Sequence, residues 1–215
     1  MLTRRLPFFA LTAVIAAILF SNIQATQATE CSAILKSADI KHKQTVQQYQ
    51  AGTDEYLGAL YEIEDELFAA MKRCPDDSVV ISAMGELQLS LGQIPIATLY
   101  GQKAIQMDNG NWQAHYVLGS ALNLQKKYSE GLAYLKKASE LQPENYSLLV
   151  NLCSSYEKNK LYPKAITACT TAIEKGPYDI RGTAYHLRAL AYTGNNELTL
   201  AEKDSKLAKE FGFQK

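Results

Sequence analysis

The sequence predicts an all-α protein built as a stacked array of antiparallel helix hairpins. Apolar residues recur at spacings of three and four, which is the period of one helix face. Small residues also repeat every thirty-four positions: Gly85, Gly119 and Cys153 are equivalent, as are Ala97, Gly131 and Ala165, and Ala104, Ala138 and Ala172. A period of this length is typical of helical-hairpin arrays, in which small residues stand where two helices approach closely.

Residues 146–179 give the clearest example of the repeating hairpin. The first helix has an apolar face formed by Leu149, Leu152, Cys153 and Tyr156. The second has a face formed by Ala165, Ile166, Cys169, Ala172 and Ile173. Pro163 suits the first turn of the second helix, and Gly176-Pro177 ends it.

The remaining units follow in order along the chain. Residues 29–77 are predicted to form an N-terminal hairpin that caps the array, because an end repeat would otherwise leave an apolar face bare. Residues 78–111, 112–145, 146–179 and 182–215 form four repeats, and two extra residues lengthen the connection at 177–181. The charged final helix, 198–211, is expected to act as the C-terminal cap.

The N-terminal hairpin has its predicted turn at Gly52-Thr53, where Thr53 can cap the second helix. The expected apolar residues of its first helix are Ile34, Leu35, Ala38, Val46 and Tyr49. Those of its second helix are Leu57, Leu60, Tyr61, Leu67, Phe68 and Met71, and Cys74-Pro75 ends it. The acidic run at 62–66 is expected to be a solvated face.

Residues 1–28 are predicted to be a secretory signal peptide, with Arg4 and Arg5 before an apolar stretch from Leu6 to Phe20 and with cleavage after Ala25 or Ala28. An uncleaved membrane anchor is the alternative, although about 15 apolar residues are fewer than the ~20 that a spanning helix needs. Export to the periplasm of a Gram-negative bacterium follows from this prediction, with secretion or membrane anchoring as alternatives.

Composition and charge exclude several classes of protein. Apolar residues make up 47% of the 215 residues and charged residues 20%, as in an ordinary folded domain. Without the signal peptide, 20 basic residues face 22 acidic ones, and no basic patch is present. The sequence therefore predicts neither a nucleic-acid-binding protein nor a polybasic membrane-surface protein.

The four cysteines are predicted to form two disulfides, because an exported chain with an even number of cysteines normally pairs them. Residues that face each other across an antiparallel hairpin are equidistant from its turn. Cys153 and Cys169 are symmetric about Leu161, and Cys31 and Cys74 about Gly52-Thr53. The alternative for Cys153 and Cys169 is a pair of free, buried thiols. A redox-active pair is not expected, because no Cys-x-x-Cys is present.

At these positions the chain resembles the tetratricopeptide repeat (TPR) family. The family pattern of Leu-Gly, an aromatic, Ala, Ala and Pro is met by Leu118-Gly119, Ala138 and Pro143, and by Tyr156, Ala165, Ala172 and Pro177. The resemblance implies a right-handed superhelical solenoid whose first helices line a concave groove that holds an extended peptide or a partner helix. The groove positions carried over from the family are Ser82, Glu86, Leu89, Gln113, Tyr116, Ser120, Asn123, Ser147, Asn151, Ser154, Glu157 and His186.

The groove residues are mostly small, polar and neutral, and Asn, Gln and Ser can bond a peptide backbone while Tyr116 offers a stacking surface. A solvated surface without a ligand is the alternative. The carboxylate-clamp branch of the family uses Lys or Arg with Asn at these places, and here only Asn151 matches. A clamp for a C-terminal carboxylate is therefore not expected.

No motif for catalysis, metal binding or a cofactor is found. His42, His115 and His186 are about seventy residues apart, and no H-E-x-x-H, phosphate-binding loop or G-x-S-x-G is present. The sequence therefore predicts a non-enzymatic, exported scaffold or assembly factor that binds a protein or peptide. A self-associating structural protein that stacks through its end repeats is the alternative.

Overall fold

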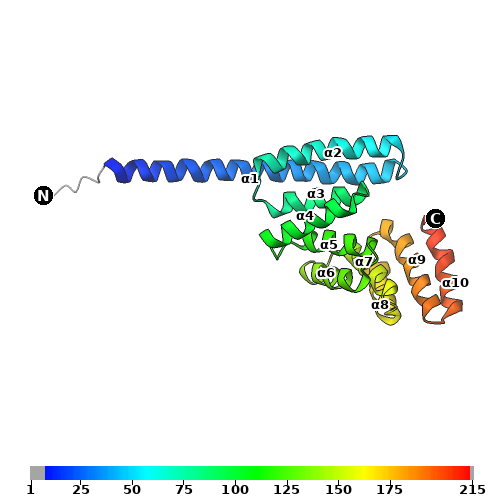
Figure 1. Cartoon of the computed structure of the whole chain (residues 1–215). Coiled ribbons are helices and arrows are strands. Elements are labelled where there is room, and N and C mark those ends of the chain that lie inside the picture. The colour runs from blue at the N-terminus through cyan, green and yellow to red at the C-terminus, as the bar shows by residue number, and fades with distance from the viewer. Residues whose placement is uncertain (1–7, 214–215) are drawn as a thin grey trace. The chain divides into compact units, whose positions relative to one another are not determined.

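A computed structural model describes residues 8–213 of the chain, with side chains described from residue 25 onward. Every regular element in that part is an α-helix, as Figure 1 shows. The chain divides into two compact units, Met1–Val80 and Ile81–Lys215. Each unit is described by itself, and the prediction of an all-helical hairpin array is confirmed.

The first unit is a hairpin of α1 (Phe8–Gln48) and α2 (Asp54–Arg73). Its turn contains Gly52, whose φ of 87° lies in the left-handed region that glycine adopts without strain. Thr53 then caps α2, because its hydroxyl oxygen accepts the N–H of Tyr56 at 3.3 Å. The predicted turn and cap therefore fold as expected.

Helix α1 begins earlier than residue 29, the expected start of the hairpin, and runs through Ala25 and Ala28 without a break. No proline or glycine occurs between Phe8 and Gln48 to end it. Residues 1–7 of the expected signal peptide, and the side chains of residues 8–24, lie outside the described part, so the signal peptide stays a prediction. Among helices with described side chains, none is sufficiently long and apolar to cross a membrane.

The contact between α1 and α2 uses one narrow stripe on each helix. On α1 the buried residues Cys31, Ala38 and Thr45 are seven positions apart. On α2 the stripe consists of Tyr56, Leu60, Ile63, Leu67 and Ala70. Tyr61 and Phe68, expected in the apolar face, are instead 53% and 43% exposed, because a single partner helix covers only one stripe.

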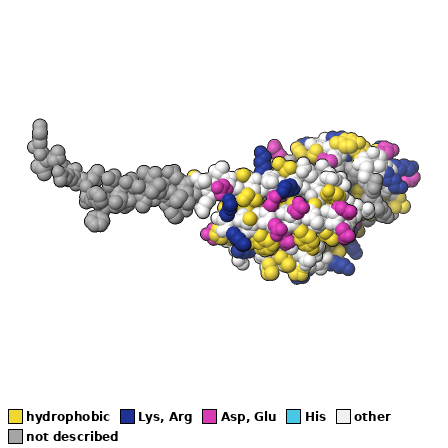
Figure 2. Space-filling model, turned by 90° about the horizontal axis from the view of Figure 1, so that it is seen from above, with side chains coloured by type: hydrophobic (Ala, Val, Ile, Leu, Met, Phe, Trp, Pro, Cys, Tyr) yellow, Lys and Arg dark blue, Asp and Glu magenta, His cyan; other side chains and the backbone are white. Residues whose placement is uncertain are grey.

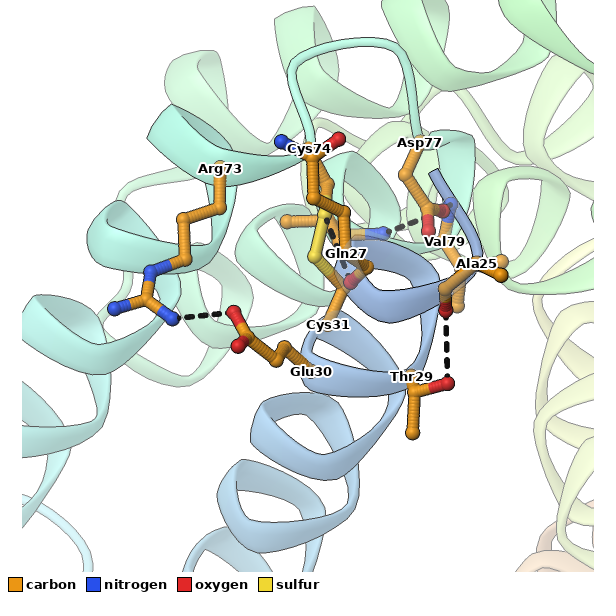
Figure 3. The surroundings of a disulfide bond; sticks show 10 residues. Ala25, Gln27, Thr29, Glu30, Cys31, Arg73, Cys74, Asp77 and Val79 are labelled. Carbon is orange, nitrogen blue, oxygen red and sulfur yellow. Dashed lines mark hydrogen bonds and ion pairs between the residues drawn. A yellow bond between two sulfur atoms is a disulfide. The ribbon is translucent and has the colours of Figure 1, made fainter. Parts of the chain in front are cut away.

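The open end of this hairpin is closed by a disulfide between Cys31 and Cys74, whose Cα atoms are 6.7 Å apart. Figure 3 shows Arg73 beside it, with Nη1 donating to Glu30 Oε2 at 2.7 Å. Cys74 also caps α2, since its N–H donates to the carbonyl of Ala70 at 2.8 Å. Part of the acidic run is paired as well, because Glu66 forms an ion pair with Lys41.

The second unit is a run of helix pairs in which each helix packs on its neighbours in sequence. The pairs are α3 (Ser78–Ser90) with α4 (Ile94–Met107), α5 (Trp112–Leu124) with α6 (Tyr128–Leu141), α7 (Tyr146–Lys158) with α8 (Tyr162–Lys175), and α9 (Tyr178–Gly194) with α10 (Leu198–Glu210). Helix α3 begins at the boundary between the two units.

The four hairpin turns of this unit share one backbone conformation. One residue in each turn has a positive φ: Gly92 at 72°, Lys126 at 65°, Lys160 at 59° and Asn196 at 64°. The next N–H bonds back to a carbonyl five residues earlier, as from Lys127 to Leu122 at 2.9 Å. This Schellman arrangement satisfies carbonyls that the helix end leaves open and reverses the chain.

The small residues of the thirty-four-residue period lie where helices touch. A Cβ on Gly119 would approach the carbonyl oxygen of Gly131 to 2.9 Å, and one on Gly131 would approach that of Gly119 to 2.7 Å. In the next hairpin the place of Gly119 is taken by Cys153, which is bonded to Cys169 with a Cα–Cα distance of 5.5 Å. Both sulfurs belong to a fully buried cluster with Ala165.

The last hairpin differs from expectation at its start. The expected connection at 177–181 is largely helical, because α9 begins at Tyr178, directly after its N-cap Pro177. Ile180 packs against the buried cluster around Ala172, so the extra residues lengthen the helix instead of the loop. Arg188 of α9 and Asp204 of α10 then form a buried ion pair at 2.7 Å.

Candidate functional site

The predicted groove residues lie on α3, α5, α7 and α9, and apart from the partly buried Leu89 the structure divides them into three groups. The first group joins α3 to α5. Gln113 Nε2 donates to Glu86 Oε2 at 3.4 Å, and Tyr116 interacts with both Glu86 and Ser120. These four residues, Glu86, Gln113, Tyr116 and Ser120, are partly buried and form a continuous set that we call the inner polar cluster.

The phenol of Tyr116 is held in its protonated form. Burial, followed by the negative charge of Glu86, raises the pKa of Tyr116 to about 12, while a hydrogen bond with Ser120 acts in the opposite direction. At neutral pH the phenol is therefore a hydrogen-bond donor beside a carboxylate. A peptide backbone, which offers one donor and one acceptor per residue, can use both kinds of group.

The second group lies on α7 and is open to solvent. Ser147 is exposed, and Asn151 and Ser154 are partly buried. Asn151 Nδ2 donates to the carbonyl of Ser147 at 3.0 Å, so its amide oxygen remains the group that can accept from a ligand. Glu157 ends this row with an ion pair to Lys158 at 3.0 Å.

The third group holds expected groove residues whose side chains point toward other parts of the fold. Ser82 is fully buried, and its hydroxyl accepts Asn111 Nδ2 at 3.2 Å, which ties α3 to the start of α5. Asn123 turns its buried amide oxygen toward Gly131 of α6. His186 stacks on Phe213, with ring centroids 4.1 Å apart. These side chains contact other parts of the fold, and such contacts cannot be read from a family position alone.

The helix array thus presents the inner polar cluster on α3 and α5 and the Ser147–Asn151–Ser154 row on α7. The arrangement offers hydrogen-bond donors and acceptors and one aromatic ring, which suits noncovalent recognition. Within residues 25–213, no group of three His, Cys, Asp or Glu side chains is placed to hold a metal ion. On the face that Figure 2 shows, acidic and basic side chains are mixed with hydrophobic ones.

Sequence reasoning overlooked two kinds of residue. Asn111 was not expected to link helices, although an Asn just before a helix is a common N-cap, and its Oδ1 does accept the N–H of Ala114 at 3.2 Å. Lysines at the turns were also overlooked. Lys126 and Lys160 are thirty-four residues apart and could have been recognised as one repeated turn position.

Similarity to known proteins is visible in the fold. By sequence, no family model and no curated protein matches the chain. A crystal structure of MamA is 25% identical over 72% of this chain and 89% of that chain, with a TM-score of 0.58. MamA from Desulfovibrio magneticus RS-1 is 17% identical over 83% of this chain and 94% of that chain, with a TM-score of 0.60.

A third similar structure is YrrB, described as a TPR protein with an unusual peptide-binding site. It is 14% identical over 80% of this chain and 92% of that chain, with a TM-score of 0.58. These likenesses extend over most of both chains in each comparison. The fold of this chain is therefore that of a TPR-like solenoid.

Proposed function

We propose that the chain is an exported protein-interaction module that binds an extended peptide or a partner helix on the inner face of its helix array. The observation that carries the proposal is the inner polar cluster. Its Tyr116 donor and Glu86 carboxylate lie side by side, and the acceptor of Asn151 is on a later inner helix. Spaced donors and acceptors of this kind match the alternating N–H and C=O groups of an extended chain.

The fold supports this proposal. Helical-hairpin arrays present extended concave surfaces for binding, and the similar protein YrrB is described as having a peptide-binding site. By contrast, Glu202, Lys203, Lys206 and Glu210 of α10 line a shallow surface hollow, and Lys206 pairs with Glu202 at 2.9 Å. These charged side chains do not favour stacking of copies through this part of α10, which also exposes Leu198 and Leu200.

The disulfides support export, because such bonds persist in oxidising compartments such as the bacterial periplasm. We infer a periplasmic location in a Gram-negative bacterium, with the mature chain beginning near residue 26 or 29. The intact mass of protein isolated from the native envelope tests this. A mature chain that retains residues 1–25, or that contains four free thiols, would refute export by a cleaved signal peptide.

The binding surface can be tested with a selected ligand. A peptide library displayed on phage is panned against the immobilised, oxidised protein, and the affinity of a selected peptide is then measured by calorimetry. Tyr116→Phe combined with Asn151→Ala removes one donor and one acceptor. Because each hydrogen bond contributes about 0.5–1.5 kcal/mol, affinity should fall roughly tenfold.

A matched control removes two polar side chains from outer helix surfaces, with Gln102→Ala on α4 and Glu140→Ala on α6, both of which are exposed. The control should bind the peptide as the wild type does. The melting temperatures of both variants should stay within a few degrees of the wild type. Equal affinity of the wild type and the Tyr116/Asn151 variant would place the ligand elsewhere and overturn the inner-face assignment.

A further inference from the structure

Two consecutive hairpin turns of the second unit border an open surface hollow of about 470 Å³. One wall is the turn between α5 and α6, and the other is the turn between α7 and α8. Four lining side chains are lysines, Lys126, Lys127, Lys158 and Lys160, and one is an acid, Glu130. We call this hollow the basic turn site.

The walls of the basic turn site are fixed to each other by hydrogen bonds. Asn159 Nδ2 donates to the carbonyl oxygen of Tyr128 at 3.0 Å, and Ser129 Oγ donates to Asn159 Oδ1 at 3.1 Å. Asn159 also bonds its own helix at Ser155, at 2.8 Å. The two turns therefore keep the hollow formed without a ligand. This lowers the entropic cost of binding, because the turns do not have to become ordered when a ligand binds.

The basic turn site carries a net positive charge, because four lysines lie beside only two acids, Glu130 in the hollow and Glu157 next to it. Lys158 lies 3.0 Å from Glu157, but no ion pair among residues 25–213 includes Lys126, Lys127 or Lys160. Several like charges around one concave space raise the local potential and favour an anion there. A ligand with negative charge would therefore bind to a preformed excess of cations.

The backbone gives a second reason to assign a role to these lysines. Lys126 and Lys160 have φ values of 65° and 59°, whereas the same turn position holds Gly92 and Asn196 in the other two hairpins. Glycine adopts this conformation freely and asparagine does so readily, but a lysine is strained in it. Turn formation alone would favour glycine, so the ammonium groups are the feature that lysine adds at these two positions.

We propose that the basic turn site binds a carboxylate-rich segment of a protein partner. The hollow is open to solvent, so an acidic segment of a partner chain can reach the lysines of both turns. The flexible stems of lysine can follow carboxylates on successive residues of such a segment. The site uses turn residues and none of the inner polar cluster, so it does not depend on the inner-face proposal.

The test uses the oxidised full-length protein and a fluorescein-labelled hexaglutamate peptide, with binding followed by anisotropy at low and at physiological salt. Lys126→Gly with Lys160→Gly removes two charges and relieves the strained turns. Affinity should fall about tenfold, since exposed ion pairs contribute up to about 1 kcal/mol each. The melting temperature should stay equal or rise, which separates a binding role from a structural one.

The control variant removes the same charge elsewhere, through Lys103→Gln and Lys136→Gln at exposed helix positions of α4 and α6. Its affinity for hexaglutamate should change less than twofold. Equal losses in both variants would mean that net charge alone attracts the peptide, and no loss in the glycine variant would mean that the site is not used. Either result overturns the proposal.

Two further arms separate other anions from a protein segment. Vesicles of phosphatidylserine and phosphatidylcholine are tested by co-sedimentation, and inorganic phosphate is compared with sodium chloride at equal ionic strength. We expect the wild type and the glycine variant to bind vesicles equally. We also expect phosphate and sodium chloride to displace hexaglutamate from the protein to the same extent. Lysine-dependent vesicle binding without hexaglutamate binding, or much stronger displacement by phosphate, would assign the site to another ligand and overturn the proposal.

Discussion

The ion pair between Arg188 and Asp204 provides a strong test of how the last hairpin is held. Arg188 Nε donates to Asp204 Oδ2 at 2.7 Å and Nη2 to Oδ1 at 3.1 Å, while Nη1 reaches Thr170 Oγ1 on α8 at 2.9 Å. The two side chains are only 14% and 4% exposed. One guanidinium thus connects α8, α9 and α10.

Arg188→Ala should destabilise the protein far more than a surface substitution. It leaves the Asp204 carboxylate buried without its partner, and removal of one member of a buried pair costs about 3–5 kcal/mol. For a chain of this size that corresponds to a fall of roughly 10 °C in melting temperature. Asp204→Ala should cost less, because the guanidinium keeps Thr170 and the tyrosine rings 5.4 and 5.8 Å away.

The double variant Arg188→Met with Asp204→Leu completes the test. Because burying both charges costs desolvation energy, an apolar pair of similar size should recover most of the loss. Unfolding in guanidinium chloride, followed by circular dichroism, measures all variants, and hydrogen exchange shows whether the loss is confined to α9 and α10. A change below about 1 kcal/mol for Arg188→Ala would refute the reasoning. A double variant as unstable as the single one would do the same.

The remaining predictions concern close contacts, a disulfide and pH. Gly131→Ala should lower the free energy of unfolding by about 1–3 kcal/mol, because the added Cβ would meet the backbone of α5. Gly58→Ala places its Cβ in open space and should raise the free energy of unfolding slightly. Denaturant titrations measure both changes. Replacing Cys153 and Cys169 by Ala should cost about 3 kcal/mol by the loop-closure argument; an unchanged denaturation midpoint would contradict it. The pKa of Tyr116 is about 12 in the folded protein and about 10 in the unfolded chain. The protonated phenol therefore contributes stability that is complete below pH 10 and is lost as the pH rises through 12. In alkaline melting curves, the melting temperature of Tyr116→Phe should fall less between these pH values than that of the wild type.

The hairpin array could be predicted from sequence because its evidence is local or periodic. The thirty-four-residue period places Gly119 and Gly131 at one contact, and symmetry about a turn gives the cysteine pairs that the structure contains. Thr53 and Pro177 mark helix ends by their own chemistry. Each of these inferences needs only a short stretch of chain or a fixed spacing.

Burial at individual positions could not be predicted in the same way. Tyr61 and Phe68 are exposed because α1 covers a single stripe of α2, and nothing in the sequence of α2 sets the width of that stripe. Ser82 and His186 are engaged by Asn111 and Phe213, which lie in other elements. The inner polar cluster and the basic turn site likewise depend on which neighbouring helices and turns come together.

The disulfide between Cys153 and Cys169 has a consequence for how the array unfolds. In a linear array each hairpin is stabilised mainly by its neighbours, so unfolding begins at an end and advances one hairpin at a time. When unfolding reaches α7 and α8 from the C-terminal side, the disulfide still joins these two helices near their midpoints, so they cannot separate. Unfolding should halt there, so that loss of α9 and α10 leaves residues up to about Lys175 folded, including the proposed binding surface on α3, α5 and α7.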